Sequence, residues 1–282
     1  MDTTLRGTGD GWIYEGVFSP QGDQVATCTW SEVHVWNPDN WNLNAVLEGL
    51  ESAWITSLSW TPTGDTIAGS MSDMEHGTYE IWMWDAYSGE EINKIKGTEF
   101  WVEEVCFSPD GKKLVSSSGN MANDKGNLII WGSSLGQPRQ ILARNDATIR
   151  TVDWSENSKL IACGETDDLI RIYDATDDHL IDSLAGHDYH VNKVRFSPDN
   201  KMLASTSMDK SRRVWALETM ELEHVFSAHT SSTYWPAVSN KGLTITLCWH
   251  FLIIHNFGES DAASSVKRSF CHFPMHRGRH AG

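Results

Sequence analysis

Apolar and polar residues alternate over short segments of this chain, and the same arrangement returns at regular intervals. Val191–Phe196 is representative, since its apolar and polar positions alternate up to a Ser-Pro-Asp turn. Alternation with a period of two is typical of β-strands that bury one face. The pattern therefore predicts an all-β fold of short strands joined by tight turns.

A turn motif marks a repeating unit. Phe18-Ser19-Pro20-Gln21-Gly22 returns in similar form with its first aromatic residue at 60, 107, 154 and 196, and in a degenerate form at Val238. The five aromatic positions are 42, 47, 47 and 42 residues apart. Proline fixes φ and glycine accepts positive φ, so the motif suits a turn between strands. The spacing fits a four-stranded propeller blade of about 40–45 residues.

Two further signals recur at fixed places in each unit. The third predicted strand ends on an aromatic residue: Trp36, Trp84, Trp131, Tyr173, Trp215 and, in the last unit, His255. With its Trp84-Asp85 and Gly186-His187 dipeptides, the chain resembles the WD-repeat family over residues 2–256. The resemblance implies a β-propeller of four-stranded antiparallel blades around a central channel.

The resemblance also implies a buried hydrogen-bonded set in each blade, made of a histidine, a strand hydroxyl, a turn aspartate and the third-strand tryptophan. Only the fifth unit keeps all four, as His187, Ser205 or Ser207, Asp209 and Trp215. In the other units the histidine position holds Thr8, Leu50, Thr98, Asn145 and His229. We interpret His187 and Asp209 as structural, and expect the other five blades to rely more on apolar packing than on buried polar networks.

A propeller must close, because open sheet edges are prone to pairing with other chains. Thr3-Thr4-Leu5 resembles a fourth strand that could complete the last of six blades within residues 1–256. A truncated seven-bladed ring is the alternative. Residues 257–282 carry no blade signature and are basic, which favours a disordered tail. Its Cys271, His272, His276 and His280 could bind a metal on a helix, but Pro274 and Gly278 would break that helix, so no metal site is expected.

Composition narrows the function. The formal net charge of −16 disfavours binding to nucleic acid and to anionic membranes. The five cysteines show no paired spacing, and no apolar segment is long enough to target or span a membrane. These features predict reduced cysteines in a cytoplasmic protein, with the nucleus as the alternative compartment.

The family resemblance places a binding surface at the top of the channel, beside the first apolar residue of each blade. Those apolar residues are Ile13, Ile55, Val102, Ile149, Val191 and Thr233. The preceding residues are Trp12, Trp54, Trp101, Thr148, His190 and Ser232, and the following ones are Tyr14, Thr56, Glu103, Arg150, Asn192 and Tyr234. The three tryptophans at one repeat position predict an aromatic arc, extended by Tyr14 and Tyr234. The alternative is that they only pack between blades.

The loops support the arc. From the motif aromatic to the third-strand aromatic, units two and three span 24 residues and the others 17 to 19. We therefore expect long top-face loops at 71–77 and 119–126, which carry Met74, Glu75, Met121 and Asp124. Adaptable methionines, aromatic rings and acidic groups predict a groove for a protein or peptide with an apolar anchor and a basic residue, such as arginine stacked on tryptophan.

No catalytic motif is present: the chain has no phosphate-binding glycine loop, nucleophile elbow or zinc-protease motif. We therefore expect a protein-interaction scaffold that is not an enzyme and needs no cofactor. A structural subunit of a larger assembly is the main alternative. A hydrolase built on a propeller, with channel carboxylates or a metal, is the less favoured one.

Overall fold

The computed structural model describes residues 13–96, 98–120, 122–132 and 138–227, and the backbone of three later strands at 235–238, 243–248 and 251–256. The predicted closing strand at Thr3–Leu5 and the predicted tail at 257–282 lie outside the described residues. Within them every regular element is a β-strand, and no helix there could cross a membrane.

The strands form six antiparallel sheets, each from consecutive strands. The first two sheets contain β1 (Glu15–Phe18), β2 (Val25–Cys28), β3 (Glu32–Trp36) and β4 (Leu43–Glu48), then β5 (Ala53–Trp54), β6 (Leu58–Trp60), β7 (Thr66–Asp73), β8 (Thr78–Asp85) and β9 (Glu91–Lys96). The third and fourth contain β10 (Trp101–Phe107), β11 (Lys113–Asn120), β12 (Lys125–Gly132) and β13 (Pro138–Asn145), then β14 (Ile149–Trp154), β15 (Leu160–Glu165), β16 (Ile170–Asp174) and β17 (Leu180–Leu184). The last two contain β18 (Val191–Phe196), β19 (Met202–Ser207), β20 (Arg212–Ala216) and β21 (Glu221–Phe226), then β22 (Trp235–Val238), β23 (Leu243–Cys248) and β24 (Phe251–Asn256).

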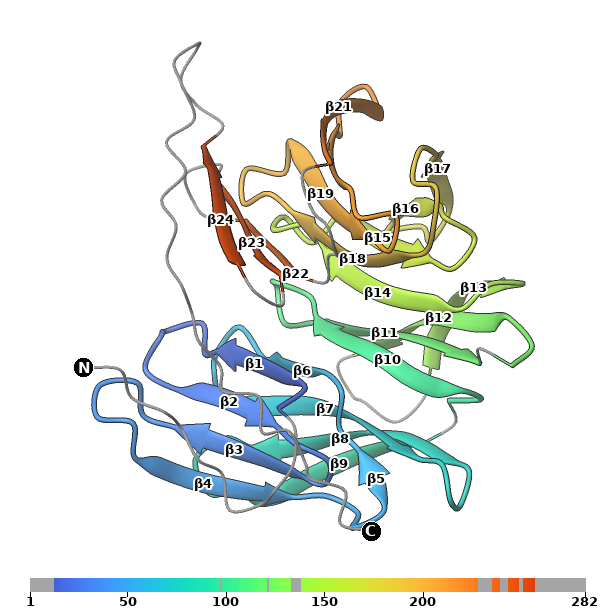
Figure 1. The fold of residues 1–282 in the computed structure, drawn as a ribbon. Coiled ribbons are helices and arrows are strands. Elements are labelled where there is room, and N and C mark those ends of the chain that lie inside the picture. Colours follow the sequence, from blue (N-terminus) through green and yellow to red (C-terminus); the bar gives the residue numbers. More distant parts are fainter. Residues whose placement is uncertain are drawn as a thin grey trace, which may run out of the picture.

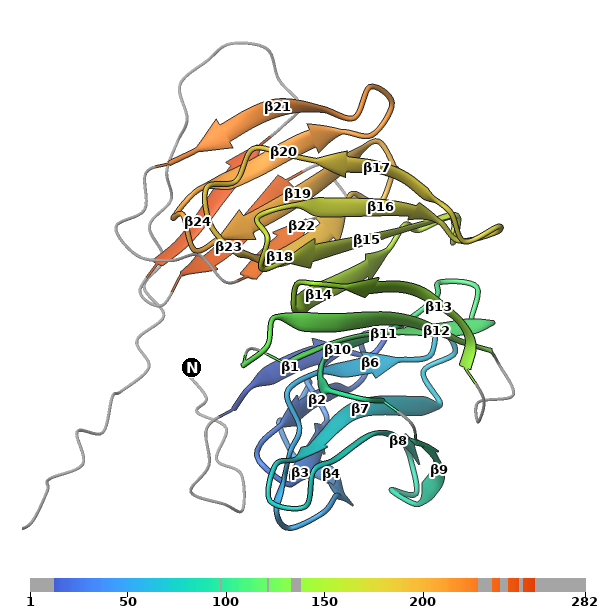
Figure 2. The ribbon, with the colours of Figure 1, turned by 90° about the vertical axis from the view of Figure 1, so that its right-hand side faces the viewer.

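The sheets are the blades of a propeller. Their inner strands β1, β6, β10, β14, β18 and β22 lie toward the centre, and the outer strands lie at the rim (Figure 1). Viewed from the side, successive sheets stack on one another (Figure 2). The predicted all-β propeller is therefore confirmed. The inner position of blade two is split into β5 and β6, and three strands of the sixth sheet are described.

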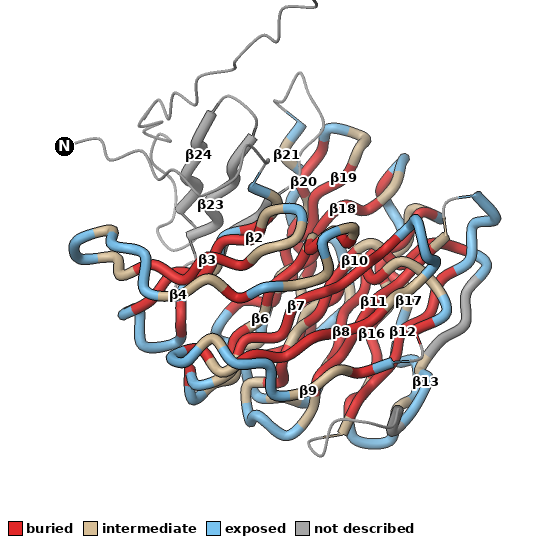
Figure 3. The backbone as a smooth tube through the Cα atoms, turned by 90° about the horizontal axis from the view of Figure 1, so that it is seen from below, coloured by how far each residue is buried: buried red, intermediate tan, exposed pale blue. Residues whose placement is uncertain are grey.

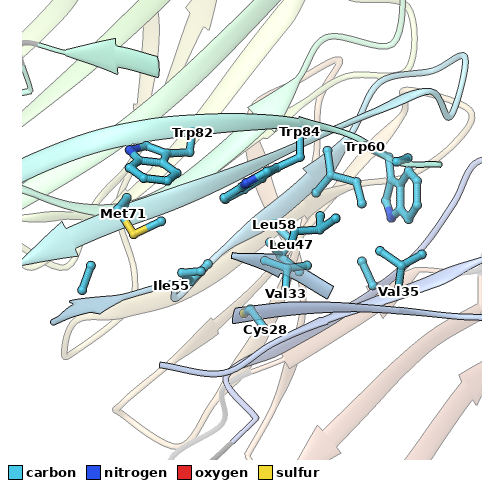
Figure 4. Packing of buried hydrophobic residues seen from close by; sticks show 14 residues of the cluster. Cys28, Val33, Val35, Leu47, Ile55, Leu58, Trp60, Met71, Trp82 and Trp84 are labelled. Carbon is cyan, nitrogen blue, oxygen red and sulfur yellow. The ribbon is translucent and has the colours of Figure 1, made fainter. Parts of the chain in front are cut away.

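The core lies between neighbouring blades. Figure 3 shows buried residues along the strands and exposed residues at their ends. Between blades one and two, Trp60, Trp82 and Trp84 from one sheet pack against Val33 and Leu47 of the other (Figure 4). The predicted third-strand aromatics of the first five blades are all buried. Burying large rings between sheets is the main apolar contribution that holds the blades together.

The turn-motif aromatic of blade one departs from this pattern. Trp60, Phe107, Trp154 and Phe196 are buried, whereas Phe18 is 64% exposed. Each motif aromatic lies against the preceding blade: the Trp60 Nε1 donates a hydrogen bond to the Val17 carbonyl 3.3 Å away. For Phe18 the preceding neighbour would be the last blade, whose side chains lie outside the description. Ile13, 55% exposed, differs from its buried counterparts in the same way.

A second set of contacts joins the inner strands. At one repeat position, a side-chain oxygen accepts a hydrogen bond from a backbone N–H of the next blade. The pairs are Glu15 with Leu58 N (2.7 Å), Ser57 with Val105 N (3.2 Å), Glu104 with Val152 N (3.1 Å) and Thr151 with Val194 N (3.3 Å). These bonds fix the angle between successive blades through groups that burial would otherwise leave unsatisfied.

The junction between blades five and six cannot form this bond. Lys193 stands at the acceptor position, 42 residues after Thr151, and Pro236 stands at the donor position, 42 residues after Val194. An ammonium group has no acceptor and proline has no N–H, so both partners are changed together. Lys193 instead turns to carboxylates of other blades: its Nζ lies 2.8 Å from Glu104 Oε1 and 3.6 Å from Glu15 Oε1.

The fifth blade contains the hydrogen bonds that the family resemblance implies. Trp215 Nε1 donates to Ser205 Oγ at 2.9 Å, the Ser205 hydroxyl lies 2.7 Å from His187 Nε2, and His187 Nδ1 lies 2.8 Å from Asp209. The Ser205 oxygen accepts a hydrogen bond from Trp215, so the Ser205 hydroxyl can donate its own proton to His187 Nε2. A neutral His187 then carries its proton on Nδ1 and donates it to Asp209. Burial lowers the pKa of His187, against the opposing effect of Asp209.

Two of the remaining blades keep one hydrogen bond of this set beside their apolar packing. Trp36 Nε1 donates to Thr27 Oγ1 and Trp131 Nε1 donates to Ser116 Oγ, both at 2.9 Å. These blades keep the tryptophan–hydroxyl bond without the histidine. The physical reason is that a buried indole N–H needs an acceptor whether or not a longer chain of polar groups continues behind it.

Candidate functional site

The candidate site is the top face, meaning the end of the ring that carries the turns between second and third strands and the connections between blades. Here the inner strands of blades two to five contain an irregularity at the same repeat position. Pairing is shifted around Glu103, Arg150 and Asn192, and in blade two the strand is interrupted between Trp54 and Leu58. A bulge changes the direction of a side chain. The predicted channel-mouth residues are thus the bulged ones.

Aromatic side chains from the first three blades meet on this face. Trp54 stacks on Tyr14 with centroids 6.0 Å apart, packs against Trp30 at 4.9 Å, and meets Trp101 edge to face at 5.5 Å. We call Tyr14, Trp30, Trp54 and Trp101 the aromatic cluster. All four are at least partly exposed, and Trp30 is 46% exposed. The rings therefore pack on one another and still face solvent. This arrangement combines the exposed arc predicted from the sequence with the alternative of packing between blades.

Trp30 was missed in reasoning from the sequence. It lies in the turn after β2, and the turns between second and third strands share the top face with the blade connections. An aromatic residue in such a turn is the signal that could have found it. Of the other predicted aromatics, Trp12 and Tyr234 lie outside the described residues.

The expectation of long top-face loops in blades two and three is corrected. The extra residues lengthen strands: β7 and β8 have eight residues each, as do β11 and β12, with turns at 74–77 and near 121–124. Met71, expected in a loop, is fully buried in β7, whereas Met74 at the tip is 65% exposed. Ladder hydrogen bonds satisfy the added backbone more completely than a loop would, which favours extension of the hairpin.

These extended hairpins border a pocket. It has a volume of about 530 Å³ and opens on the top face, and its lining is mostly apolar. The lining residues are Met74, Tyr79, Phe100, Trp101, Glu103, Gly119, Asn120 and Ala122. A Cβ added to Gly119 would lie 2.1 Å from Thr148 Cγ2, so only glycine allows blade four to pack this closely behind the pocket. Trp101 belongs to both the pocket and the aromatic cluster.

Glu103 is the one residue with a carboxyl group among these lining residues. Burial raises its pKa to about 7, against the opposing effect of the Arg150 guanidinium on β14, while the neighbouring Glu104 raises it further. The carboxyl group is therefore easier to protonate than an exposed glutamate, and Arg150 compensates its charge only in part.

The remaining predicted residues have other surroundings. Thr56 Oγ1 lies 3.1 Å from Ser70 Oγ, and His190 Nδ1 lies 2.6 Å from the Thr166 carbonyl in the neighbouring blade. Asp124 accepts a hydrogen bond from Thr166 Oγ1 at 3.1 Å, which joins the β11–β12 turn to blade four. Glu75 is exposed at the β7–β8 turn, Asn192 is buried, and Met121 lies outside the described residues.

Chemical groups for other functions can be checked in the same part of the chain. Cys28, Cys106 and Cys163 are free thiols, and burial raises the pKa of each. The described residues contain no cluster of three or more potential metal ligands. The predicted tail residues Cys271, His272, His276 and His280 lie outside them.

Comparison with protein families identifies the repeat. The model described as "WD domain, G-beta repeat" matches residues 89–131, 136–174 and 179–215. Each match runs from the outer strand of one blade to the third strand of the next, ending at or beside Trp131, Tyr173 and Trp215. One sequence repeat therefore contains the outer strand of one blade and the first three strands of the next blade.

Curated relatives match a larger part of the chain. The "Nuclear distribution protein PAC1" of Arthroderma benhamiae is 24% identical over 246 residues, covering 77% of this chain and 52% of the relative. The "Eukaryotic translation initiation factor 3 subunit I" of Meyerozyma guilliermondii is 28% identical over 144 residues, covering 45% of this chain and 41% of the relative. This chain thus spans about half the length of these relatives or less.

The repeat matches, the six stacked antiparallel sheets and the relatives agree with one another. WD repeats provide scaffolds for protein interaction or subunits of assemblies, and this is the broad class of function that the comparisons support. Residues 89–215 of this chain therefore contain WD repeats, and the chain as a whole is similar to WD-repeat β-propeller proteins.

Proposed function

We propose that the top face of blades one to three is a docking surface for a protein or peptide partner. The observation that carries this proposal is the aromatic cluster, in which Trp54 of blade two contacts Tyr14 and Trp30 of blade one and Trp101 of blade three while the rings stay partly exposed. Packed rings lose little side-chain entropy on binding and offer a large apolar area, which is why aromatic residues dominate many interfaces.

The neighbouring groups extend this surface. The exposed Met74 at the β7–β8 tip supplies a flexible apolar contact beside the ring of Trp101. Glu103 supplies a carboxyl group, and the net charge of −16 favours partners with basic segments over nucleic acid. The docking surface therefore suits an apolar anchor next to a basic residue.

The proposal predicts that the double variant Trp54→Ala/Trp101→Ala loses its partner while the fold survives. Both side chains sit at the partly exposed end of their strands, so the melting temperature is expected to fall by less than about 4 °C. Affinity purification from cells followed by mass spectrometry compares the variant with the wild-type chain. A matched control is Tyr87→Ala, because Tyr87 is 65% exposed in the β8–β9 turn at the opposite end of the ring.

Two outcomes would count against this docking surface. One is an unchanged set of captured proteins in the double variant. The other is a fall of about 10 °C or more in melting temperature, which would show that the rings mainly hold the blades together.

A permanent subunit of an assembly is the second candidate, and one relative's name, a subunit of translation initiation factor 3, favours it. The two candidates differ in solution. A subunit stays with its assembly through gel filtration of a cell extract in 0.5 M salt (~0.5 M suffices to screen surface charges), whereas a docking platform elutes at the mass of the single chain.

A further inference from the structure

The pocket beside the aromatic cluster is lined by aromatic rings and a carboxyl group, and both present negative charge to an occupant. Three rings line it: Tyr79 from β8, Phe100 from the residue before β10, and Trp101 from the first position of β10. Glu103 adds a carboxyl group. The face of an aromatic ring carries negative partial charge, and so does a carboxylate. A site of this kind is complementary to a cation that also has apolar or planar surface.

An apolar occupant would fit the rings but not the carboxyl group. It would remove Glu103 further from water without giving it a partner, which is costly for an ionised group. The protein itself compensates this charge only in part, since Arg150 acts on it from β14 while Glu104 opposes that effect. A bound cation would complete the compensation.

We propose that this pocket receives the side chain of an arginine from the partner, with its guanidinium against the rings and paired with Glu103. This rests on the proposed docking surface and adds the chemistry of one anchor. Guanidinium is planar, is weakly hydrated and pairs with a carboxylate through two N–H donors, whereas ammonium is a compact and strongly hydrated charge. The mixture of rings and one carboxylate fits the first better.

The direct test uses blocked tripeptides, acetyl-Gly-Xaa-Gly-amide, in which Xaa is arginine, lysine or citrulline. Citrulline keeps the shape of arginine without its charge. Binding is followed by the indole N–H resonances of protein labelled with ¹⁵N-tryptophan, and the Trp101 signal is assigned with Trp101→Phe. The arginine peptide is expected to shift the Trp101 resonance saturably and to bind at least about tenfold more tightly than the citrulline peptide.

Two variants test the assigned contacts. Glu103→Gln keeps the size of the side chain and is expected to weaken arginine-peptide binding about tenfold, as loss of a charge-assisted pair does. Phe100→Leu keeps an apolar wall and removes a ring, and is expected to weaken it severalfold. Tyr87→Ala, on the opposite face, is the control and should bind like wild type. Melting temperatures of all three check that the fold persists.

The dependence on pH gives an independent reading. The cation prefers ionised Glu103, so arginine-peptide affinity should increase as pH rises from 6 to 8, through the pKa of about 7. The charged groups that act on Glu103 are Arg150 and Glu104, and the pKa of Glu104 is lowered by Lys193 and Arg195. His76 is a second titratable group, on the adjacent hairpin, and its bond to Asp73 raises its pKa. The increase should therefore vanish in Glu103→Gln and persist in His76→Gln.

Equal binding of the arginine and citrulline peptides, or an unchanged affinity in Glu103→Gln, would overturn the assignment. Lysine binding as tight as arginine would overturn the choice of guanidinium. The broader proposal has a separate result: if these peptides fail while Trp54→Ala/Trp101→Ala still abolishes capture of the cellular partner, the docking surface stands and the arginine pocket does not.

Discussion

Replacing Lys193 with methionine should lower the free energy of unfolding by about 3–5 kcal/mol, the typical cost of leaving one partner of a buried ion pair uncompensated. The Lys193 ammonium is almost fully buried between Glu104 of blade three and Glu15 of blade one. Together with Arg195, it lowers the pKa of Glu104 to about 2 against the effect of burial. Without Lys193, the carboxylates would keep only part of their compensation.

Urea unfolding of wild type and Lys193→Met measures this loss. Lys201→Met is the matched control, because Lys201 is exposed and its replacement should change stability by no more than about 0.5 kcal/mol. A double-mutant cycle with Glu104→Gln should give a coupling energy above about 1 kcal/mol. A midpoint unchanged in Lys193→Met would show that the contacts across the channel contribute nothing to stability.

His187→Ala should destabilise the protein by about 3 kcal/mol, because it leaves Ser205 and Asp209 without a shared partner and opens a cavity at a buried site. Thr27→Val in blade one is the comparison, since it removes only the single hydrogen bond from Trp36 and should cost about 1–2 kcal/mol. Equal losses in the two variants would mean that the longer hydrogen-bond chain adds nothing beyond its first link.

The same histidine predicts a dependence on pH. Burial lowers the pKa of folded His187 below its usual 6.5. Its contribution is therefore complete above pH 6.5 and is lost as pH falls through the folded-state pKa, where the folded protein must accept a proton on Nε2, the nitrogen that accepts the hydrogen bond from Ser205. The difference in unfolding free energy between wild type and His187→Ala should shrink over that range. A constant difference between pH 5 and 8 would contradict the neutral form of His187.

The sequence predicted most of the fold because each repeat carries its own strands, turns and packing rings. The motif aromatics at 60, 107, 154 and 196 are buried, and so are the third-strand aromatics of the first five blades. Phe18 shares the motif and is exposed, because its environment depends on another blade and not on its neighbours in sequence. The loop expectation failed for a similar reason: extra residues in blades two and three could lengthen either a loop or a hairpin.

The site was only partly readable from the sequence. Equivalent repeat positions identified Tyr14, Trp54, Trp101 and Glu103, since residues at one repeat position lie at one height in the ring. Trp30 does not occupy that repeat position. It lies in the turn between β2 and β3, from which its ring reaches Trp54 with centroids 4.9 Å apart. Nor could spacing alone show that Phe100 and Tyr79, from two blades, line one pocket with Glu103.

The sequence by itself determined the repeat, the all-β class and the heights at which residues lie along the channel, because strand alternation and turn chemistry act over a few neighbouring residues. The tertiary structure decided which residues from different blades come into contact. The Lys193 ion pairs, the aromatic cluster and the pocket all join residues about one to four blades apart. Their energies depend on distance and burial between blades, and these exist only once the sheets have stacked around the ring.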